Sequence, residues 1–305
     1  MSSILRSIHV LAMIESTSLT VTISSWFASR MACWGVLRWM RHMSLLIGSS
    51  ILLLMILSSI FASVVSHYDP IEQNLMNSLQ PPSFEHLFGT DNFGRDIFSR
   101  VIHATKLDLQ IGVLCVFFPM IIGVVLGCLA GYLGGITDTV VMRIVDIFTA
   151  FPFLVLVIAI IAILGPGLVS MYIALTLAGW SAYARIVRGE ILIVKQTQYI
   201  QAARALGYGN WRIIFRHVLP NVVTSVIIFS VADIILVILS TTSLSFLGLG
   251  VQPPTAEWGG MIADGRGFMM TAWWLITFPG LAIMLAGLAL SLFGDGLADL
   301  LRIED

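Results

Sequence analysis

The sequence predicts an all-α protein that crosses a membrane several times. Of its 305 residues, 58% are hydrophobic and only 11% are charged, and the mean hydropathy is +0.95. A typical soluble domain has a charged fraction of about 25%. Several apolar runs approach or exceed the ~18 residues that a membrane-spanning helix needs. We therefore expect six transmembrane helices, at residues 44–66, 109–132, 147–164, 168–184, 221–247 and 272–293.

The first of these helices follows a tail, residues 1–43, that contains Arg30, Arg38 and Arg41. Basic residues beside a span hold that end in the cytoplasm, so we expect a cytoplasmic N-terminal tail. The apolar run 8–14 is short and is followed at once by Glu15, which disfavours a cleaved signal peptide. Residues 44–66 are then an uncleaved membrane anchor. We expect residues 1–30 to be dispensable for the activity of the protein.

Residues 67–108 form a polar loop, expected on the extracytoplasmic side, before a core at 109–305. Its glycines and aspartates suit turns, and 95–106 suits an interfacial helix. We favour helix caps and ion pairs over substrate contact for its charged residues. His67 and His86 lack metal-site spacing, so no metal is expected. The middle of this polar loop, residues 81–100, reads PPSFEHLFGTDNFGRDIFSR.

Span 109–132 carries glycines at a spacing of four, which places them on one helix face and allows close packing in lipid. These are Gly123, Gly127 and Gly131. The span also holds Cys115 and Cys128, which lie roughly 20 Å apart on one helix and are expected to be packing residues, like Cys33. After a short turn, Arg143 and Asp146 are spaced to pair at the cytoplasmic edge.

The segment 185–220 contains six of the sixteen Lys and Arg residues between two apolar spans. Its residues Tyr199, Ala202, Ala203 and Leu206 recur at helical spacing and predict one apolar stripe on a short helix. Thr197 suits the start of that helix and Gly207 its end. Asn210 is expected to cap a second short helix, and Pro220 to break the chain before the next span. We interpret the resulting helix–turn–helix as a docking element.

This segment resembles the cytoplasmic "EAA" loop of ABC-importer permeases, which inserts a coupling helix into a cleft of the ATPase subunit. Gln201 stands where that family usually has Glu, and His217 where Ile is usual; His at this position is familiar in the peptide/nickel branch. The resemblance assigns the following residues to the loop: Tyr199, Gln201, Ala202, Ala203, Leu206, Gly207, Leu219 and Pro220.

Three further stretches are similar to the same branch, and the resemblance covers about residues 34–305. They are the Gly89–Arg100 part of the polar loop (Gly89, Asp91, Gly94, Arg95, Asp96, Arg100), SLSFLGLGVQPPTAEWGG and the ending GDGLADLLR. The second stretch is expected to be ordered and non-helical at the outer mouth. The chain resembles the second, "C-type", permease. This implies a second homologous permease, two cytoplasmic ATP-binding subunits and an extracytoplasmic substrate-binding protein as partners.

A count of charges agrees with six spans and cytoplasmic termini. The tails and the loops 133–146 and 185–220 receive twelve of the sixteen Lys and Arg residues. Only Asp233 is charged in the middle of a span, where a charge costs at least ~2.5 kcal/mol. We expect either a packing role or a place lining the substrate path. No basic residue of this chain lies at that depth, so its partner is expected to be water or the second permease.

The sequence lacks the phosphate-binding G-x4-G-K-[ST] loop and the catalytic motifs H-E-x-x-H and G-x-S-x-G. An intramembrane enzyme would need several polar groups at membrane depth, and a self-contained channel would leave the coupling-like loop unexplained. No catalytic residue, cofactor or nucleic-acid partner is expected. The sequence therefore indicates a non-catalytic inner-membrane permease subunit, driven by separate ATPases. Di- or oligopeptides are the expected cargo, with nickel or a metal chelate as the alternative.

Overall fold

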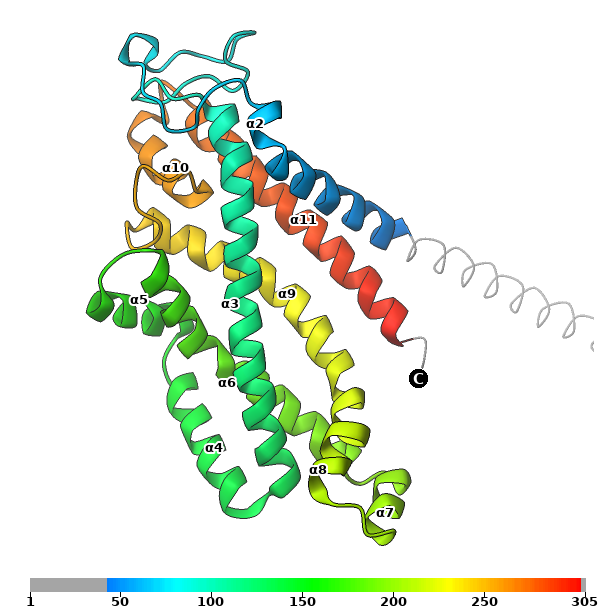
Figure 1. The fold of residues 1–305 in the computed structure, drawn as a ribbon. Coiled ribbons are helices and arrows are strands. Elements are labelled where there is room, and N and C mark those ends of the chain that lie inside the picture. The colour runs from blue at the N-terminus through cyan, green and yellow to red at the C-terminus, as the bar shows by residue number, and fades with distance from the viewer. Residues whose placement is uncertain (1–42, 303–305) are drawn as a thin grey trace, which may run out of the picture.

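The computed structural model describes residues 43–302, and every regular element within them is a helix (Figure 1). Expectations for the tail before Met43 lie outside the described residues. Short helical turns lie at Leu75–Asn77 and Arg266–Phe268. The helices are Met43–Ile60, α2 (Ala62–Val65), α3 (Ile97–Leu133), α4 (Gly135–Thr149), α5 (Phe153–Leu164), α6 (Leu168–Val194), α7 (Gln198–Ala205), α8 (Asn210–Ile213), α9 (Leu219–Phe246), α10 (Trp258–Gly265) and α11 (Trp274–Arg302).

The centre of the fold is the packing of α3 along α6. Three of the four glycines of α3, namely Gly123, Gly127 and Gly131, lie against α6 so closely that side chains there would collide with it. A Cβ atom added at Gly127 would lie 2.6 Å from the carbonyl oxygen of Ala184, and one at Gly131 would lie 3.0 Å from Cβ of Ile191. The predicted close-packing face is thus confirmed. The two thiols of α3, Cys115 and Cys128, are free and buried, also as expected.

Four described helices are long and apolar enough to cross a membrane, namely Met43–Ile60, α3, the continuous run Asn210–Phe246 and α11 up to Leu301. The bent pair α4 and α5 brings the number to as many as five. The remaining predicted span lies in α6, which has 27 residues but a more polar sequence. Its small and polar residues, among them Ser181 and Tyr183, are buried against neighbouring helices. The fold is all-α and membrane-spanning, as predicted.

The third predicted span, residues 147–164, is not one straight helix. The chain bends by 86° between α4 and α5, and the break falls at residues 150–152. Pro152 explains it, because proline lacks an N–H donor and disfavours helical geometry in the preceding residue. Pro152 itself is extended in ψ, at 130°, and becomes the cap of α5.

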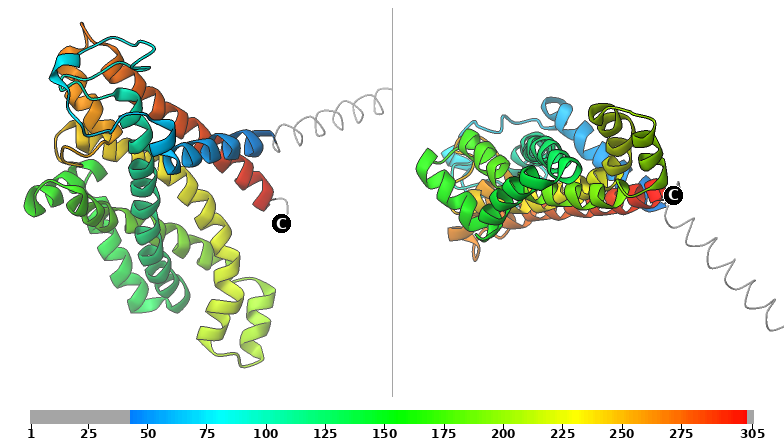
Figure 2. Two further views of the ribbon diagram at one scale, coloured as in Figure 1. Left: turned by 45° about the horizontal axis from the view of Figure 1, so that its top comes forward. Right: turned by 90° about the horizontal axis from the view of Figure 1, so that it is seen from below.

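Two other predicted spans are parts of longer helices. The predicted interfacial helix 95–106 and the span that follows it are a single helix, α3, which begins at Ile97. The family-like ending GDGLADLLR belongs to α11. Figures 1 and 2 show an elongated molecule with α7 and α8 at one extremity and α10, with the loop 66–96, at the other.

Candidate functional site at the coupling loop and the membrane cavity

The segment between α6 and α9 forms the predicted helix–turn–helix at one extremity of the molecule (Figure 1). Gly207 has a φ of 79°, so it supplies the left-handed turn between α7 and α8, as expected. Thr197 occupies the N-cap position of α7, but its side chain makes no capping hydrogen bond. Its hydroxyl donates instead to the carbonyl oxygen of Val194, at 2.7 Å.

The predicted apolar stripe of α7 divides into an exposed and a buried part. Tyr199 and Leu206 are 46% and 73% exposed, and Ala202 is exposed as well. Ala203, however, is only 5% exposed and packs into the main core of this chain. A residue that the sequence reasoning did not single out, Ile200, anchors α7 there and is fully buried. The spacing of Ile200 and Ala203, three residues apart, is the signal that identifies this inner face.

The second half of the segment differs from its prediction in two ways. Asn210 is the first residue of α8 and Gly209 is its N-cap. Pro220 does not break the chain, since Leu219 is helical at φ −57° and ψ −44° and the helix runs on from Asn210 to Phe246. A π-helical turn, Ile214–Val218, precedes the proline. We attribute the continuity to this turn, whose wider spacing relieves the carbonyl clash that proline causes in a regular helix.

Two large apolar side chains of this second half are exposed beside α7. Trp211 is 64% exposed and Phe215 is 63% exposed, and their rings stack with centroids 6.1 Å apart. They and the exposed apolar residues of the α7 segment belong to the same helix–turn–helix at the end of the molecule. We call this set, Tyr199, Ala202, Leu206, Trp211 and Phe215, the coupling surface.

The helices that carry the coupling surface are tied to the end of α3. The guanidinium of Arg204 lies over the ring of Tyr132, 5.0 Å from its centroid. The Tyr132 hydroxyl donates to Oδ1 of Asn210 at 3.4 Å, and Nζ of Lys195 donates to the carbonyl oxygen of Gly131 at 3.0 Å. Gln201, in contrast, is exposed and donates to the carbonyl oxygen of Gln196. Displacement of α7 would therefore be transmitted to α3.

A cavity of about 570 Å³ lies farther along α9, walled by α5, α6, α9 and the bend between α4 and α5. Its walls are mainly apolar and include four phenylalanines, Phe148, Phe151, Phe153 and Phe229. The predicted mid-span acid, Asp233, also lines it.

The partner of Asp233 comes from this chain, which corrects the expectation of water or a second permease. The Tyr183 hydroxyl of α6 donates to Oδ2 of Asp233 at 2.7 Å. Tyr183 is itself 1% exposed and its ring meets that of Phe229 edge-on, with centroids 5.0 Å apart. The sequence offered no signal for this pair, because its members lie fifty residues apart on different helices.

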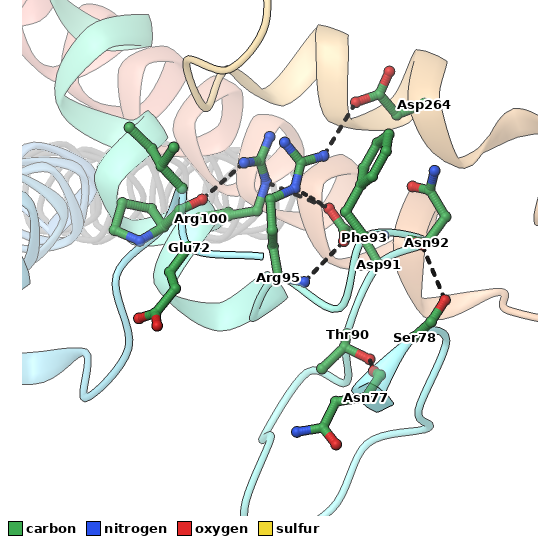
Figure 3. A network of polar contacts seen from close by, with 12 residues as sticks. Glu72, Asn77, Ser78, Thr90, Asp91, Asn92, Phe93, Arg95, Arg100 and Asp264 are labelled. Carbon is green, nitrogen blue, oxygen red and sulfur yellow. Dashed lines mark hydrogen bonds and ion pairs between the residues drawn. The ribbon is translucent and has the colours of Figure 1, made fainter. Parts of the chain in front are cut away.

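At the opposite extremity, the loop 66–96 is built around Asp91 (Figure 3). Oδ1 of Asp91 accepts from the backbone N–H groups of Phe93 and Arg95, and Oδ2 accepts from Nε of Arg95 at 2.6 Å. Arg95 also lies 3.7 Å from Asp264 of α10, and Arg100 donates to the carbonyl oxygen of Pro70. These contacts fasten the loop to α3 and α10, and they confirm the structural interpretation of its charged residues.

The same loop starts α3. Oδ2 of Asp96 accepts from the backbone N–H of Ser99 at 2.7 Å, which caps the helix, and Oδ1 contacts Nδ1 of His86 at 2.9 Å. His86 therefore belongs to a cap. Among residues 43–302, no three His, Cys, Asp or Glu side chains gather as a metal site would require.

A buried carboxyl group, that of Glu257, caps the N-terminus of α10 in the same way. Glu257 is 2% exposed and accepts from the backbone N–H groups of Gly259 and Gly260, at 2.8 and 2.7 Å. Burial raises the pKa of Glu257 above its usual value, against the opposing effect of these two hydrogen bonds. Burial likewise raises the pKa of Asp264, and Arg95 opposes it. The predicted non-helical stretch, residues 243–260, is non-helical only in its middle, at 247–257, because its ends belong to α9 and α10.

A helical membrane protein with a protruding helix–turn–helix at one end and an apolar cavity within the helices has the organisation of a transport permease. Comparison with known families agrees. The chain belongs to the family described as the binding-protein-dependent transport system inner membrane component, which matches residues 123–302. Residues 34–82 match the N-terminal transmembrane domain of oligopeptide transport permease C. The resemblance to the peptide/nickel branch of ABC-importer permeases is thereby confirmed.

Several named relatives are similar over most of the chain. The dipeptide transport system permease protein DppC of Alkalihalophilus pseudofirmus is 43% identical over 256 residues, covering 84% of each chain. The di/tripeptide permease DppC of Pseudomonas aeruginosa is 42% identical, with 83% of this chain and 86% of the relative covered. The glutathione permease GsiD of Pectobacterium atrosepticum is 42% identical, with 86% and 87% covered.

Among solved structures, a chain of the methionine ABC transporter MetNI in an inward-facing conformation has a similar fold. The TM-score is 0.56 at 20% sequence identity, and the match covers 68% of this chain and 98% of the other. A second crystal form of the same transporter gives a TM-score of 0.55. These likenesses concern the fold.

Proposed function

We propose that this protein is a permease subunit of an ABC importer that carries di- or oligopeptides across the inner membrane. The observation that supports the peptide cargo is the agreement of the relatives described above, which are named for dipeptides, di/tripeptides and glutathione. A nickel cargo finds less support, since none of these relatives is named for nickel. In this proposal the chain provides the pathway, and separate subunits hydrolyse ATP.

The partners we propose are a second homologous permease, two cytoplasmic ATPase subunits and an extracytoplasmic binding protein. Both termini, α7 and α8 are then cytoplasmic, and the loop 66–96 faces outward. The membership of the chain in a binding-protein-dependent transport family supports this assembly. The charge distribution of the sequence supports the orientation.

The coupling surface is the proposed contact with an ATPase subunit. Exposed aromatic and aliphatic side chains such as Tyr199, Leu206 and Trp211 are poorly suited to water and well suited to an apolar cleft in a partner. They lie on helices whose inner residues, Ile200 and Ala203, are fixed in the core. Movement of the ATPase would therefore shift α7 and α8 as one body, and with them α3 through Tyr132 and α9 through the π-helical turn.

The test is to place charges on the coupling surface. Leu206→Asp and Trp211→Asp should insert into the membrane normally but reduce co-purification of the ATPase subunits at least tenfold, because a carboxylate would be desolvated at the contact. Met76→Asp is the matched control, since Met76 is 92% exposed at the other extremity. Normal ATPase association and peptide uptake in both coupling-surface variants would rule out docking at this surface.

A further inference from the structure

The cavity beside α9 combines a mainly apolar wall with one carboxyl group. Of the residues that line it, Asp233 is the only one with a carboxyl, amino, guanidinium or imidazole group. The volume, about 570 Å³, falls within the range of about 300–1,000 Å³ that small-molecule sites occupy. Sites of this kind fix a ligand by a few placed polar groups and hold the rest by apolar contact.

The carboxylate is held in one orientation. Tyr183 donates to Oδ2, and within residues 43–302 no hydrogen bond to Oδ1 is formed. Tyr183 cannot readily turn away, because it is buried, meets Phe229 edge-on and is backed by Gly123 of α3. Because a carboxylate has about four acceptor positions, Asp233 retains capacity for a donor that enters the cavity.

The chemistry of the lining selects the kind of cation. A divalent metal would require several oxygen, nitrogen or sulfur ligands, and the lining offers one carboxyl group, the Cys115 thiol and three neutral hydroxyl groups. No three His, Cys, Asp or Glu side chains gather there or elsewhere among residues 43–302. A primary ammonium needs fewer: one anionic acceptor for its charge and, around it, aromatic and apolar walls, which also attract a cation by their faces. The side chains of a short peptide would occupy the remaining space without specific contacts, which suits a pathway for varied cargo.

We propose that Asp233, oriented by Tyr183, binds the primary ammonium group of the transported molecule inside this cavity, as at the amino terminus of a peptide. This inference rests on the proposed function and adds a binding site to it. Asp233 is then a specificity-determining residue and Tyr183 a positioning residue. The mainly apolar walls make the surroundings less polar than bulk water, so the ammonium and the carboxylate interact more strongly than they would in solution.

The test uses the assembled complex in lipid nanodiscs, without ATP and without the binding protein, so that selection by that protein plays no part. Ser240→Cys introduces a thiol into the lining of the cavity. Its rate of labelling by a maleimide is measured with and without alanyl-alanine. The parent complex without this cysteine provides the background from the native thiols.

Alanyl-alanine should slow the labelling, and N-acetyl-alanyl-alanine, which lacks the ammonium, should do so at least tenfold less effectively. Asp233→Asn should abolish this difference, and Tyr183→Phe should reduce it several-fold. Asp146→Asn, which removes an exposed carboxylate outside the cavity, should leave it unchanged. N-acetyl-lysyl-alanine shows which ammonium group of a peptide can bind. Protection by this compound means that a side-chain ammonium binds as well as an amino-terminal one.

Equal protection by the free and acetylated dipeptides overturns the proposal, as does full protection in Asp233→Asn. Protection by Ni²⁺ without protection by alanyl-alanine overturns it too. Uptake of alanyl-alanine by the wild-type complex with its binding protein is measured in parallel. If that uptake is normal while protection fails, the ammonium site is wrong and the proposed function stands; if peptide uptake is absent, the proposed function itself fails.

Discussion

Gly123 of α3 lies against Tyr183 of α6 so closely that a Cβ atom at Gly123 would be 2.4 Å from the Cβ of Tyr183. The same atom would lie 2.6 Å from the carbonyl oxygen of Trp180, so neither helix could yield without moving its backbone. Gly123 therefore leaves the space in which Tyr183 lies, and Tyr183 in turn donates its hydrogen bond to Asp233. This contact joins the helix packing to the proposed binding site.

Gly123→Ala should lower the stability of the complex by about 1–3 kcal/mol, the usual cost of overpacking. Gly189→Ala is the matched control on α6, because a Cβ atom there meets nothing within 4 Å. Removing a glycine from an open helical position should stabilise the helix by roughly 0.5–1 kcal/mol. Thermal unfolding of the purified complex in detergent measures both. Equal midpoints for the two variants would contradict the packing described.

Ile200→Ala should destabilise the coupling loop, whereas Leu206→Ala should not. Ile200 is fully buried and Leu206 is 73% exposed, although both are apolar residues of the same loop. Truncating a buried isoleucine costs about 2–5 kcal/mol. Hydrogen exchange of residues 198–213 should accelerate in Ile200→Ala alone. Accelerated exchange in Leu206→Ala as well would show that the outer face is needed for folding.

The buried ion pair of the loop 66–96, Asp91 with Arg95, should contribute more to stability than an exposed ion pair does. Asp91→Asn leaves Arg95 buried without its main partner, at a cost of about 3–5 kcal/mol. Asp146 pairs with Arg185 and not, as the sequence predicted, with Arg143, and both side chains of the observed pair are more than half exposed. Asp146→Asn breaks the pair and should cost about 0–1 kcal/mol. Limited proteolysis of residues 66–96 and the unfolding midpoint should both reveal this difference. Similar behaviour of the two variants would argue against the loop scaffold.

Glu257 should make stability depend on pH. Its pKa is raised above the usual 4.5 in the folded protein, so folding favours its protonated form. This contribution is fully present below 4.5 and is lost as the pH rises through the folded pKa. Glu257→Gln, which resembles the protonated form, should lose less stability than the wild type as the pH is raised from about 5 to 8, although the neighbouring buried carboxyl group of Asp108 remains. Glu72→Gln, at an exposed position, should follow the wild type. A wild-type pH profile in Glu257→Gln would refute the assignment.

Local sequence patterns predicted those parts of the fold that depend on local chemistry. Apolar runs located the long helices, the glycine spacing of α3 predicted its packing face, and Gly207 predicted a turn. Proline was harder to interpret. Pro152 bends the chain sharply, while Pro220 is carried inside a continuous helix because a π-helical turn precedes it. The residues before each proline did not let us predict which of the two outcomes would occur.

The candidate site was predictable to a similar degree. The exposed helix–turn–helix followed from charge, spacing and turn residues, and Asp233 from its isolation in an apolar run. The division of α7 into a buried and an exposed face did not, because both faces are apolar. The partner of Asp233 was also beyond reach, because Tyr183 meets it only after α6 and α9 have packed.

The continuity of the helix from Asn210 to Phe246 has a mechanical consequence. Trp211 and Asp233 lie on the same helix, separated by a rise of about 33 Å at 1.5 Å per residue. Trp211 belongs to the coupling surface, and Asp233 lines the cavity. If this helix pivots near Trp211, a tilt of about 10° displaces the Asp233 side chain sideways by roughly 6 Å, about the pitch of one helical turn. A small rotation imposed at one end is thus amplified into a displacement large enough to withdraw the anion from its ligand.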